Sequence, residues 1–297
     1  MTGTTPTTAF NPVGVITKPG DHRLADTVQG LLCHLRSRHV EVLVDESATD
    51  LLGPESCPVH PRSRIAAECD LAIVVGGDGT LLHAARSLLD ASVPMVGINR
   101  GRLGFLADIS PEDMTQRIDE ILAGRYNEDR RFMLEGRVFR GDECLIRSDA
   151  FNDVVVRAHG MVRMIEFDTM IDGRYLATQN ADGLVVATPT GSTAYALSGG
   201  GPILYPTLEA ICLVPICPHT LSNRPIVVHS ESRIEIRICP HNTVPAMVSF
   251  DGQVNQELEP DDRIVIARRD KQLRLIQPSG FDYFQILRAK LKWSERP

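Results

Sequence analysis

One short stretch of this sequence, an apolar run followed by a glycine-rich turn, constrains the fold more than any other. Leu71–Val75 is continuously apolar, which predicts a buried strand of a parallel sheet. Gly76-Gly77-Asp78-Gly79 follows, and apolar residues then recur at helical spacing through Thr80–Leu89. Strand, turn and helix together are typical of an α/β domain.

The residue types in this turn suggest an anion site. Glycines allow backbone N–H groups to face a bound anion, and the N-terminus of the following helix adds a favourable dipole. A carboxylate at this position would repel a phosphate. Its presence is therefore explained more easily if it accepts a proton, binds a hydroxyl group or coordinates a metal ion. Asp78 therefore suggests transfer of a phosphoryl group to an alcohol. Taken alone, the turn is more typical of a tight turn with a helix-capping aspartate.

Composition narrows the class of protein. The chain has 297 residues, enough for one large or two modest domains, and its net charge of −7 argues against a nucleic-acid partner. The seven cysteines include no Cys-x-x-Cys pair, which predicts reduced thiols, and no His/Cys cluster has the spacing of a zinc site. The sequence shows neither a signal peptide nor an apolar run of about 20 residues. We therefore expect a cytoplasmic protein without a membrane partner.

The order of predicted elements suggests how the chain is divided. Strands and helices alternate through residues 1–124, which predicts an α/β domain with a largely parallel sheet. Within it, Ser110 is the expected N-cap of a helix at Pro111–Leu122. Residues 125–275 hold strand-like runs joined by short turns and predict a mainly β domain. Residues 276–297 are expected to form a helical tail that packs on the N-terminal domain.

A second polar stretch follows the apolar run Leu184–Ala187. It reads Thr188-Pro189-Thr190-Gly191-Ser192-Thr193 and continues into a short helical segment. Hydroxyl groups and glycines at a helix start suit phosphate or sugar hydroxyl groups, although a capped loop is the more typical explanation of such a stretch alone. The chain has neither a P-loop nor a G-x-G-x-x-G turn after a strand, so a nucleotide would bind without either motif.

Four stretches occur in the order and at the separations typical of one family. They are Gly76–Thr80, Asn152–Val155, Thr188–Pro202 and Pro218–Pro225. On these motifs the chain resembles the bacterial NAD kinases over nearly its whole length. The resemblance implies transfer of the γ-phosphoryl group of ATP to the 2′-hydroxyl group of the adenosine ribose of NAD, giving NADP. It also implies a divalent metal cation, with Mg²⁺ expected, and a homodimer or homotetramer.

The resemblance further implies roles for individual residues. Asp78 would act as the base or orient the hydroxyl group, with Gly79 beside it. Asn152 and Asp153 would contact the adenosine side, and Asp153 stands where many members have glutamate. The other residues implied to bind substrate are His83, Arg163, Asn180, Asp182, Thr193, Ala194, Tyr195, Ala196, Leu197, Ser198 and Gln253.

Several of these residues carry a more specific expectation. Arg163 matches a family cation near the phosphates, and Asp182 would reach the nicotinamide end, across a subunit interface. His83 would face the pocket, or lie on the surface of its helix. In the family, glycine two residues before the Asp182 position accompanies the use of polyphosphate as donor. Asn180 occupies that position here and predicts ATP as the working donor.

Two other functions stay open at this point. A lipid kinase of the diacylglycerol type carries a similar glycine–aspartate turn, and a non-catalytic dinucleotide-binding regulator could keep the pocket without the reaction. The stretch Thr188–Ser198 argues against the lipid kinase, and the intact Asp78 argues against the regulator.

Overall fold

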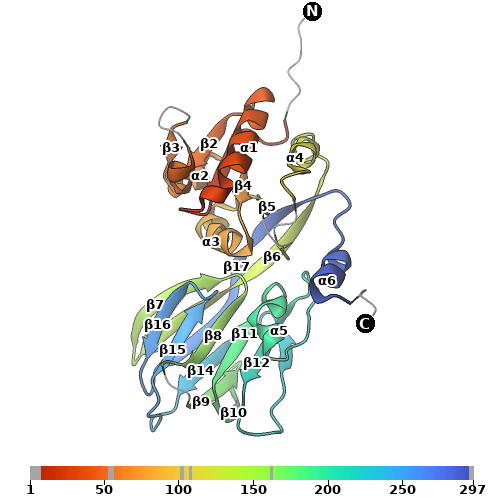
Figure 1. Ribbon diagram of the computed structural model, residues 1–297. Helices are drawn as coiled ribbons and strands as arrows, with labels where there is room; N and C mark the ends of the chain where they lie inside the picture. Colours follow the sequence, from red (N-terminus) through yellow and green to blue (C-terminus); the bar gives the residue numbers. More distant parts are fainter. Residues whose placement is uncertain (1–7, 53–56, 101–103, 107–108, 161–162, 294–297) are drawn as a thin grey trace, which may run out of the picture. The chain divides into compact units, whose positions relative to one another are not determined.

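The structure is a computed structural model that describes residues 8–52, 57–100, 104–106, 109–160 and 163–293. The chain forms two compact units (Figure 1). Unit 1 comprises Met1–Arg130 and Leu273–Pro297, and unit 2 comprises Arg131–Gln272. The chain leaves unit 1 within strand β6 (Tyr126–Arg140) and returns to it within strand β17 (Arg263–Pro278).

Unit 1 is built on a parallel sheet with the strand order β3-β2-β1-β4-β5-β17. Every residue of the adjacent strands β1 and β4 is buried, as expected for parallel strands that are covered on both faces. The strands are β1 (Val13–Thr17), β2 (Val42–Asp45), β3 (Val59–His60), β4 (Leu71–Val75) and β5 (Met95–Ile98). The helices are η1 (His22–Leu24), α1 (Ala25–Ser37), η2 (Glu46–Leu51), α2 (Arg62–Glu68), α3 (Asp78–Leu88), η3 (Leu89–Ala91), α4 (Met114–Leu122) and α6 (Tyr283–Leu291).

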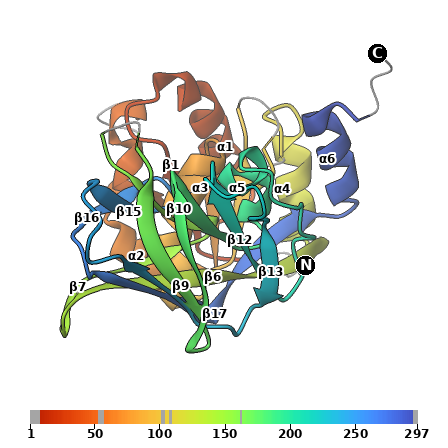
Figure 2. The same cartoon turned by 90° about the horizontal axis from the view of Figure 1, so that it is seen from below.

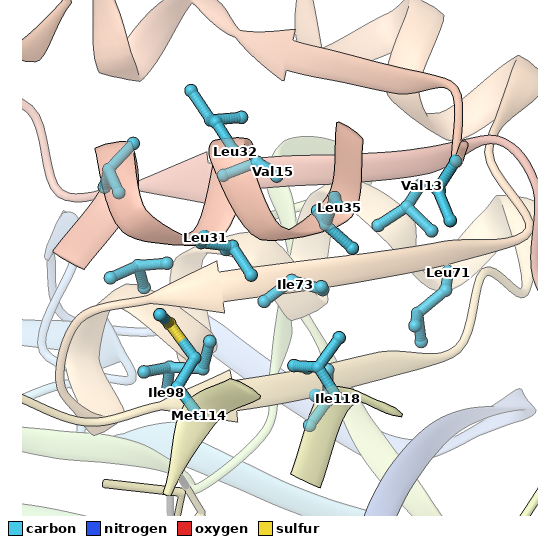
Figure 3. Close-up of a cluster of buried hydrophobic side chains, with 14 of the residues drawn as sticks. Val13, Val15, Leu31, Leu32, Leu35, Leu71, Ile73, Ile98, Met114 and Ile118 are labelled. Atoms are coloured by element: carbon cyan, nitrogen blue, oxygen red, sulfur yellow. The ribbon is translucent and has the colours of Figure 1, made fainter. Parts of the chain in front are cut away.

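Helices α1 and α4 share the main core of unit 1 with the strands (Figure 3). Leu31 and Leu35 are four residues apart on α1, as are Met114 and Ile118 on α4, so each pair lies on one helix face. They meet residues that alternate along β1 and β4, which therefore point to one side of the sheet. The strand residues concerned are Val13, Val15, Leu71 and Ile73.

Unit 2 consists mainly of antiparallel strands in two sheets. One sheet includes the order β10-β9-β14-β17, with β6 and β7 attached, and the other has the order β13-β12-β11-β8-β15-β16. Strands β9 and β10 form a hairpin that is visible in Figure 2. The elements are β7 (Glu143–Ala150), β8 (Asp153–Ala158), β9 (Ile165–Ile171), β10 (Arg174–Ala181), β11 (Gly183–Ala187), η4 (Gly191–Thr193), α5 (Tyr195–Ser198), β12 (Ala210–Ile216), β13 (Ile226–His229), β14 (Ile234–Ile238), β15 (Ala246–Phe250) and β16 (Val254–Leu258).

The alternation of side chains along β8 gives the second sheet two different faces. Val154 and Val156 belong to the large core that includes residues of the first sheet, such as Ile236. Val155 points the other way and packs in a smaller cluster with Ala196 of α5. The face that carries Val155 and α5 is the one on which a cavity opens.

The fold class predicted from the sequence is confirmed: an α/β domain with a largely parallel sheet, a mainly β domain and a C-terminal helix. The structure adds α2, β3, β10, β12 and β15–β17, which were not predicted. The helix predicted at Pro111–Leu122 begins at Met114, and its N-cap is Asp113 rather than Ser110. The Ser110 hydroxyl group instead accepts a hydrogen bond from the Asp113 N–H at 3.2 Å in the preceding turn. In the part of the chain that the structure describes, no helix is both long and apolar enough to span a membrane.

Candidate active site

The turn between β4 and α3 places Asp78 at the first position of the helix. A Cβ atom on Gly76 would lie 2.5 Å from the Thr80 hydroxyl oxygen, so the turn closes only with glycine at this position. A Cβ atom on Gly77 or Gly79 would meet no described atom within 4 Å. Packing therefore does not require glycine at 77 or 79, and the backbone there is open to a bound molecule.

The Asp78 carboxylate holds a neighbouring loop segment of unit 1. The Phe105 N–H donates to Oδ2 of Asp78 at 2.9 Å, and the Leu106 N–H donates to Oδ1 at 3.3 Å. A carboxylate oxygen can accept more than one hydrogen bond, so a ligand hydroxyl group could donate to Asp78 beside these two N–H groups. The backbone bonds fix the orientation of the carboxylate relative to the glycine turn.

A cavity of about 440 Å³ lies beside this turn, and it carries more cations than anions. Its lining includes Lys18, Arg23 and Arg100, together with the backbone of the glycine turn. Arg23 donates to both oxygens of Asp21 at 2.8 Å, and these bonds hold the pKa of Asp21 down at about 2. The other lining residues are Asp21, Leu24, Gly76, Gly77 and Asn99. Cationic side chains at a helix N-terminus suit phosphate groups.

His83, predicted for the substrate site, lies at an exposed position of α3 and does not line this cavity. Partial desolvation of its ring and the positive charges of Arg62 and Arg86 lower the pKa of His83. The imidazole is therefore favoured in its neutral form.

A second cavity, of about 510 Å³, opens on the second sheet of unit 2 next to α5. Asn152 and Asp153 stand at the start of β8, and Arg157 follows on the same strand face. The Tyr195 ring provides an aromatic wall that is 44% exposed. The remaining lining residues are Val155, Ala194, Ser249, Asp251, Gly252 and Asn255. Amide and carboxylate groups next to an exposed aromatic ring suit a nucleoside, because the groups bind sugar hydroxyls and the ring stacks on the base.

Asp153 is unusual because its carboxyl group is almost completely buried. The residue is only 5% exposed. Burial, and to a smaller extent the negative charge of Asp251, raise the pKa of Asp153 from 3.8 to about 7. Near neutral pH this group therefore exists in both the protonated and the ionised form, and it can either donate or accept a hydrogen bond.

The loop Thr188–Thr193 is bound tightly to the backbone just ahead of β8. The Thr188 hydroxyl group donates to the Phe151 carbonyl oxygen at 2.6 Å, and the Thr188 N–H donates to the Asn152 carbonyl oxygen at 2.9 Å. The buried Ser192 hydroxyl group donates to the Pro189 carbonyl oxygen at 2.6 Å. The sequence suggested ligand contacts for this group of hydroxyls, but those of Thr188 and Ser192 hold the loop itself.

The predicted substrate residues do not all reach the unit 2 cavity. Asn152, Asp153, Ala194 and Tyr195 line it. Ala196 is fully buried in the cluster beneath α5. The residues that are exposed but outside the lining are Arg163, Asn180, Ser198 and Gln253, and those that are half-buried outside it are Asp182, Thr193 and Leu197.

Asn180 and Asp182 lie outside the cavity and have hydrogen-bond partners elsewhere in unit 2. The Asn180 carbonyl oxygen, on strand β10, accepts a hydrogen bond from the His219 N–H at 2.9 Å. A hydrogen bond to the Asp182 carboxylate raises the pKa of the Cys217 thiol. The Asp182 side chain is therefore paired with a thiol in this structure.

Sequence reasoning missed several residues of the two cavities. In unit 2 they include Arg157 and Asp251, and in unit 1 Lys18 and Arg23. For Asp251 the sequence offers one signal, because Asp251-Gly252 is a dipeptide typical of turns. Among the described residues, no group of three or more His, Cys, Asp or Glu side chains could hold a metal ion.

Comparisons with known proteins identify the family. A model of the ATP-NAD kinase N-terminal domain matches residues 13–126, and a model of the ATP-NAD kinase C-terminal domain matches residues 151–278. The NAD kinase of Chromohalobacter salexigens is 48% identical over 287 residues, which are 97% of this chain and 98% of that protein. The NAD kinase of Nitrosococcus oceani is 46% identical over 287 residues, with the same coverage of 97% and 98%.

Solved structures of related enzymes have the same fold. Yeast NADH kinase complexed with NADH has a TM-score of 0.87 at 28% identity, over 97% of this chain and 89% of that chain. An NAD kinase from Archaeoglobus fulgidus in complex with ATP has a TM-score of 0.75 at 27% identity, over 95% and 98% of the two chains. The protein described here therefore belongs to the ATP-NAD kinase family.

Proposed function

We propose that the protein transfers the γ-phosphoryl group of ATP to the 2′-hydroxyl group of the adenosine ribose of NAD. The observation that carries this proposal is the unit 2 cavity, where Asn152 and Asp153 adjoin the exposed Tyr195 ring. Side chains of this kind suit a ribose and its attached base. The relatives named NAD kinase, which match nearly the whole chain, support NAD as the acceptor.

In the proposed reaction the ribose 2′-oxygen attacks the γ-phosphorus of ATP. The bond from this phosphorus to the β,γ-bridging oxygen breaks, ADP leaves, and the hydroxyl proton passes to the carboxylate of Asp78. The open backbone at Gly77 and Gly79 and the cations Lys18 and Arg100 would bind the phosphates of the nucleotides. Positioning and charge stabilisation supply most of the rate in reactions of this class.

We further propose that Mg²⁺ assists the reaction and that the enzyme is a cytoplasmic homodimer or homotetramer. The described residues provide no cluster of three acidic or imidazole ligands, and Mg²⁺ commonly binds phosphates and water with only one or two carboxylates. One carboxylate of the site would complete such coordination. The ion would neutralise charge on the transferred group.

One assay distinguishes the proposed function from its alternatives. The protein is incubated with Mg-ATP and NAD, and the NADP formed is measured with an NADP-specific dehydrogenase. A parallel reaction offers diacylglycerol in vesicles as the acceptor. NADP formation that depends on ATP supports the proposal. Phosphorylation of the lipid alone would identify a lipid kinase, and binding of NAD without turnover would identify a regulator.

Substituting alanine for Asn152 or Asp153 should chiefly raise the KM for NAD. Loss of one hydrogen bond to a ligand hydroxyl group costs about 0.5–1.5 kcal/mol, which corresponds to about two- to tenfold in KM. The KM for ATP, measured at saturating NAD, serves as the internal reference because it should change less. An unchanged KM for NAD in both variants contradicts the assignment of the acceptor site.

ATP should be a much better donor than inorganic polyphosphate. The Asn180 side chain is exposed on strand β10 and brings no positive charge to attract a polyanion. It also occupies space that glycine would leave empty. The two donors are compared at equal concentration of phosphate groups, with the variant Asn180→Gly alongside. Comparable rates with both donors in the wild-type protein would refute this prediction, and a selective rise with polyphosphate in Asn180→Gly would locate its cause.

A further inference from the structure

The side chain of Asp251, in the turn between β15 and β16, binds the backbone at the start of β8. Oδ1 of Asp251 accepts hydrogen bonds from the N–H groups of Asn152 at 2.7 Å and Asp153 at 3.2 Å. Oδ2 accepts from the Phe151 N–H at 2.9 Å. The Asp251 N–H in turn donates to the Asp153 carbonyl oxygen at 3.0 Å. A single residue therefore binds the backbone of three consecutive residues that lie about 100 positions earlier.

This role needs a carboxylate rather than a generic turn residue. Asp251 has a φ of 52° and Gly252 a φ of 67°, a left-handed pair that asparagine or glycine would also adopt. Only a carboxylate presents acceptors on both of its branches, however. An asparagine would turn an NH₂ group toward at least one backbone N–H. The three donors therefore select aspartate over the other residues that suit the turn.

We propose that Asp251 is a positioning residue for the acceptor dinucleotide, because its carboxylate fixes the backbone of residues 151–153 and so directs Asn152 and Asp153 into the cavity. This inference rests on the proposed function, in which Asn152 and Asp153 bind NAD. Asp251 itself also lines the cavity, but its two oxygens are directed to the backbone of these three residues.

The charge of Asp251 has a second effect on the same site. Burial and then the Asp251 charge raise the pKa of Asp153 to about 7. The other titratable side chains that line the cavity, among the described residues, are Arg157 and Tyr195. If the ionised carboxylate accepts ribose hydroxyl groups, the KM for NAD should fall as pH rises through about 7. Removing the Asp251 charge lowers the pKa of Asp153, so this transition should move to lower pH.

The test uses Asp251→Asn in the full-length protein, with Asp172→Asn as the matched control. Asp172 has a φ of 51°, precedes Gly173 with a φ of 73°, and accepts the Arg233 N–H at 2.8 Å. It is therefore an aspartate of the same turn type, but it does not line the cavity. We expect Asp251→Asn to raise the KM for NAD about two- to tenfold for each hydrogen bond lost, with a smaller change in kcat. Asp172→Asn should leave the KM unchanged.

Two readouts separate positioning from loss of stability. KM does not depend on the fraction of folded enzyme, and the pH midpoint of KM should move only when the Asp251 charge is removed. If Asp251→Asn fails to fold, Asp251→Gly keeps the left-handed backbone without the carboxylate and should show the same KM effect. A KM and pH midpoint equal to those of the wild type in a folded variant would overturn the inference.

The inference and the proposed function fail in different ways. If Asn152→Ala and Asp153→Ala leave the KM for NAD unchanged, the acceptor site itself is wrongly assigned. If those variants raise the KM but Asp251→Asn does not, only the role of Asp251 is refuted. In the Asp153→Ala background, Asp251→Asn should no longer shift any pH transition, because the group whose charge it affects is gone.

Discussion

Replacing Asp78 with asparagine should lower kcat about 10²–10⁴-fold, which is the usual contribution of a general base. The amide cannot take the proton of the attacking hydroxyl group, but it has nearly the same shape. Its oxygen can still accept one of the two backbone hydrogen bonds that the carboxylate receives from Phe105 and Leu106. The fold and the binding of NAD should therefore be retained. Steady-state NADP formation measures kcat, and circular dichroism with a calorimetric Tm checks the fold.

Loss of a helix-terminal carboxylate could itself perturb the protein, so the experiment needs a comparable aspartate elsewhere. Asp282 is the N-cap of α6 and accepts the Phe284 N–H at 2.8 Å. Asp282→Asn should cost a similar, small amount of stability and leave kcat close to the wild-type value. A folded Asp78→Asn variant with turnover within about threefold of wild type would leave Asp78 only the structural role of binding the backbone of Phe105 and Leu106, because general-base loss is about 10²-fold or more.

The second large effect is expected from Gly191→Ala, which should destabilise the protein and impair NAD binding together. A Cβ atom at position 191 would lie 2.0 Å from the Asn152 carbonyl oxygen and 2.7 Å from the Asn152 Cα atom. Both are backbone atoms, so no side-chain rotation relieves the clash. Either the loop or the start of β8 must move. Overpacking of this kind costs about 1–3 kcal/mol, which lowers Tm by roughly 2–12 °C in a protein of this size.

The measurement is Tm by calorimetry, combined with the KM for NAD at a temperature where the variant is folded. Gly30→Ala is the control, since a Cβ atom there lies 3.8 Å from the nearest atom, the Met114 methyl carbon. This exposed position within α1 should tolerate alanine or gain stability, because alanine favours helix. A Gly191→Ala protein with both wild-type Tm and wild-type KM would show that the loop adjusts freely, and it would remove the proposed link between this glycine and Asn152.

Local patterns predicted the α/β half of the fold well, because its strands are continuous apolar runs and its longer helices are amphipathic. Strand β12 shows where such patterns fail. It contains Pro215, and a proline normally argues against a central strand. Strand β13 pairs with β12 only as far as the pair Leu213–Ile226, so Pro215 has a neighbouring strand on the β11 side alone. The missing N–H is tolerated there, but the pairing that allows it is not visible in sequence.

In the candidate site, too, some residues could be predicted from the sequence and others could not. Asp78 and Asn152 were recognised from short motifs, and the family resemblance supplied their expected roles. The role of Asp251 is not visible in the sequence beyond a typical turn dipeptide, because its hydrogen-bond partners lie 98–100 residues away in the chain. The burial of Asp153 likewise depends on strands contributed by distant segments. Contacts of this range depend on the completed tertiary structure, which single-sequence periodicity does not describe.

The division of unit 1 between two segments of chain has a consequence for biosynthesis. Strand β5 pairs with β17 at Met95 and Leu275, and Ile276 completes the main core of the unit. A ribosome makes residues 1–130 first, then all of unit 2, and only afterwards residues 273–297. Until that last segment is made, the nascent first unit presents an unpaired strand edge and exposed apolar side chains. The contiguous second unit can therefore finish folding before the first, so that the order of completion reverses the order of translation.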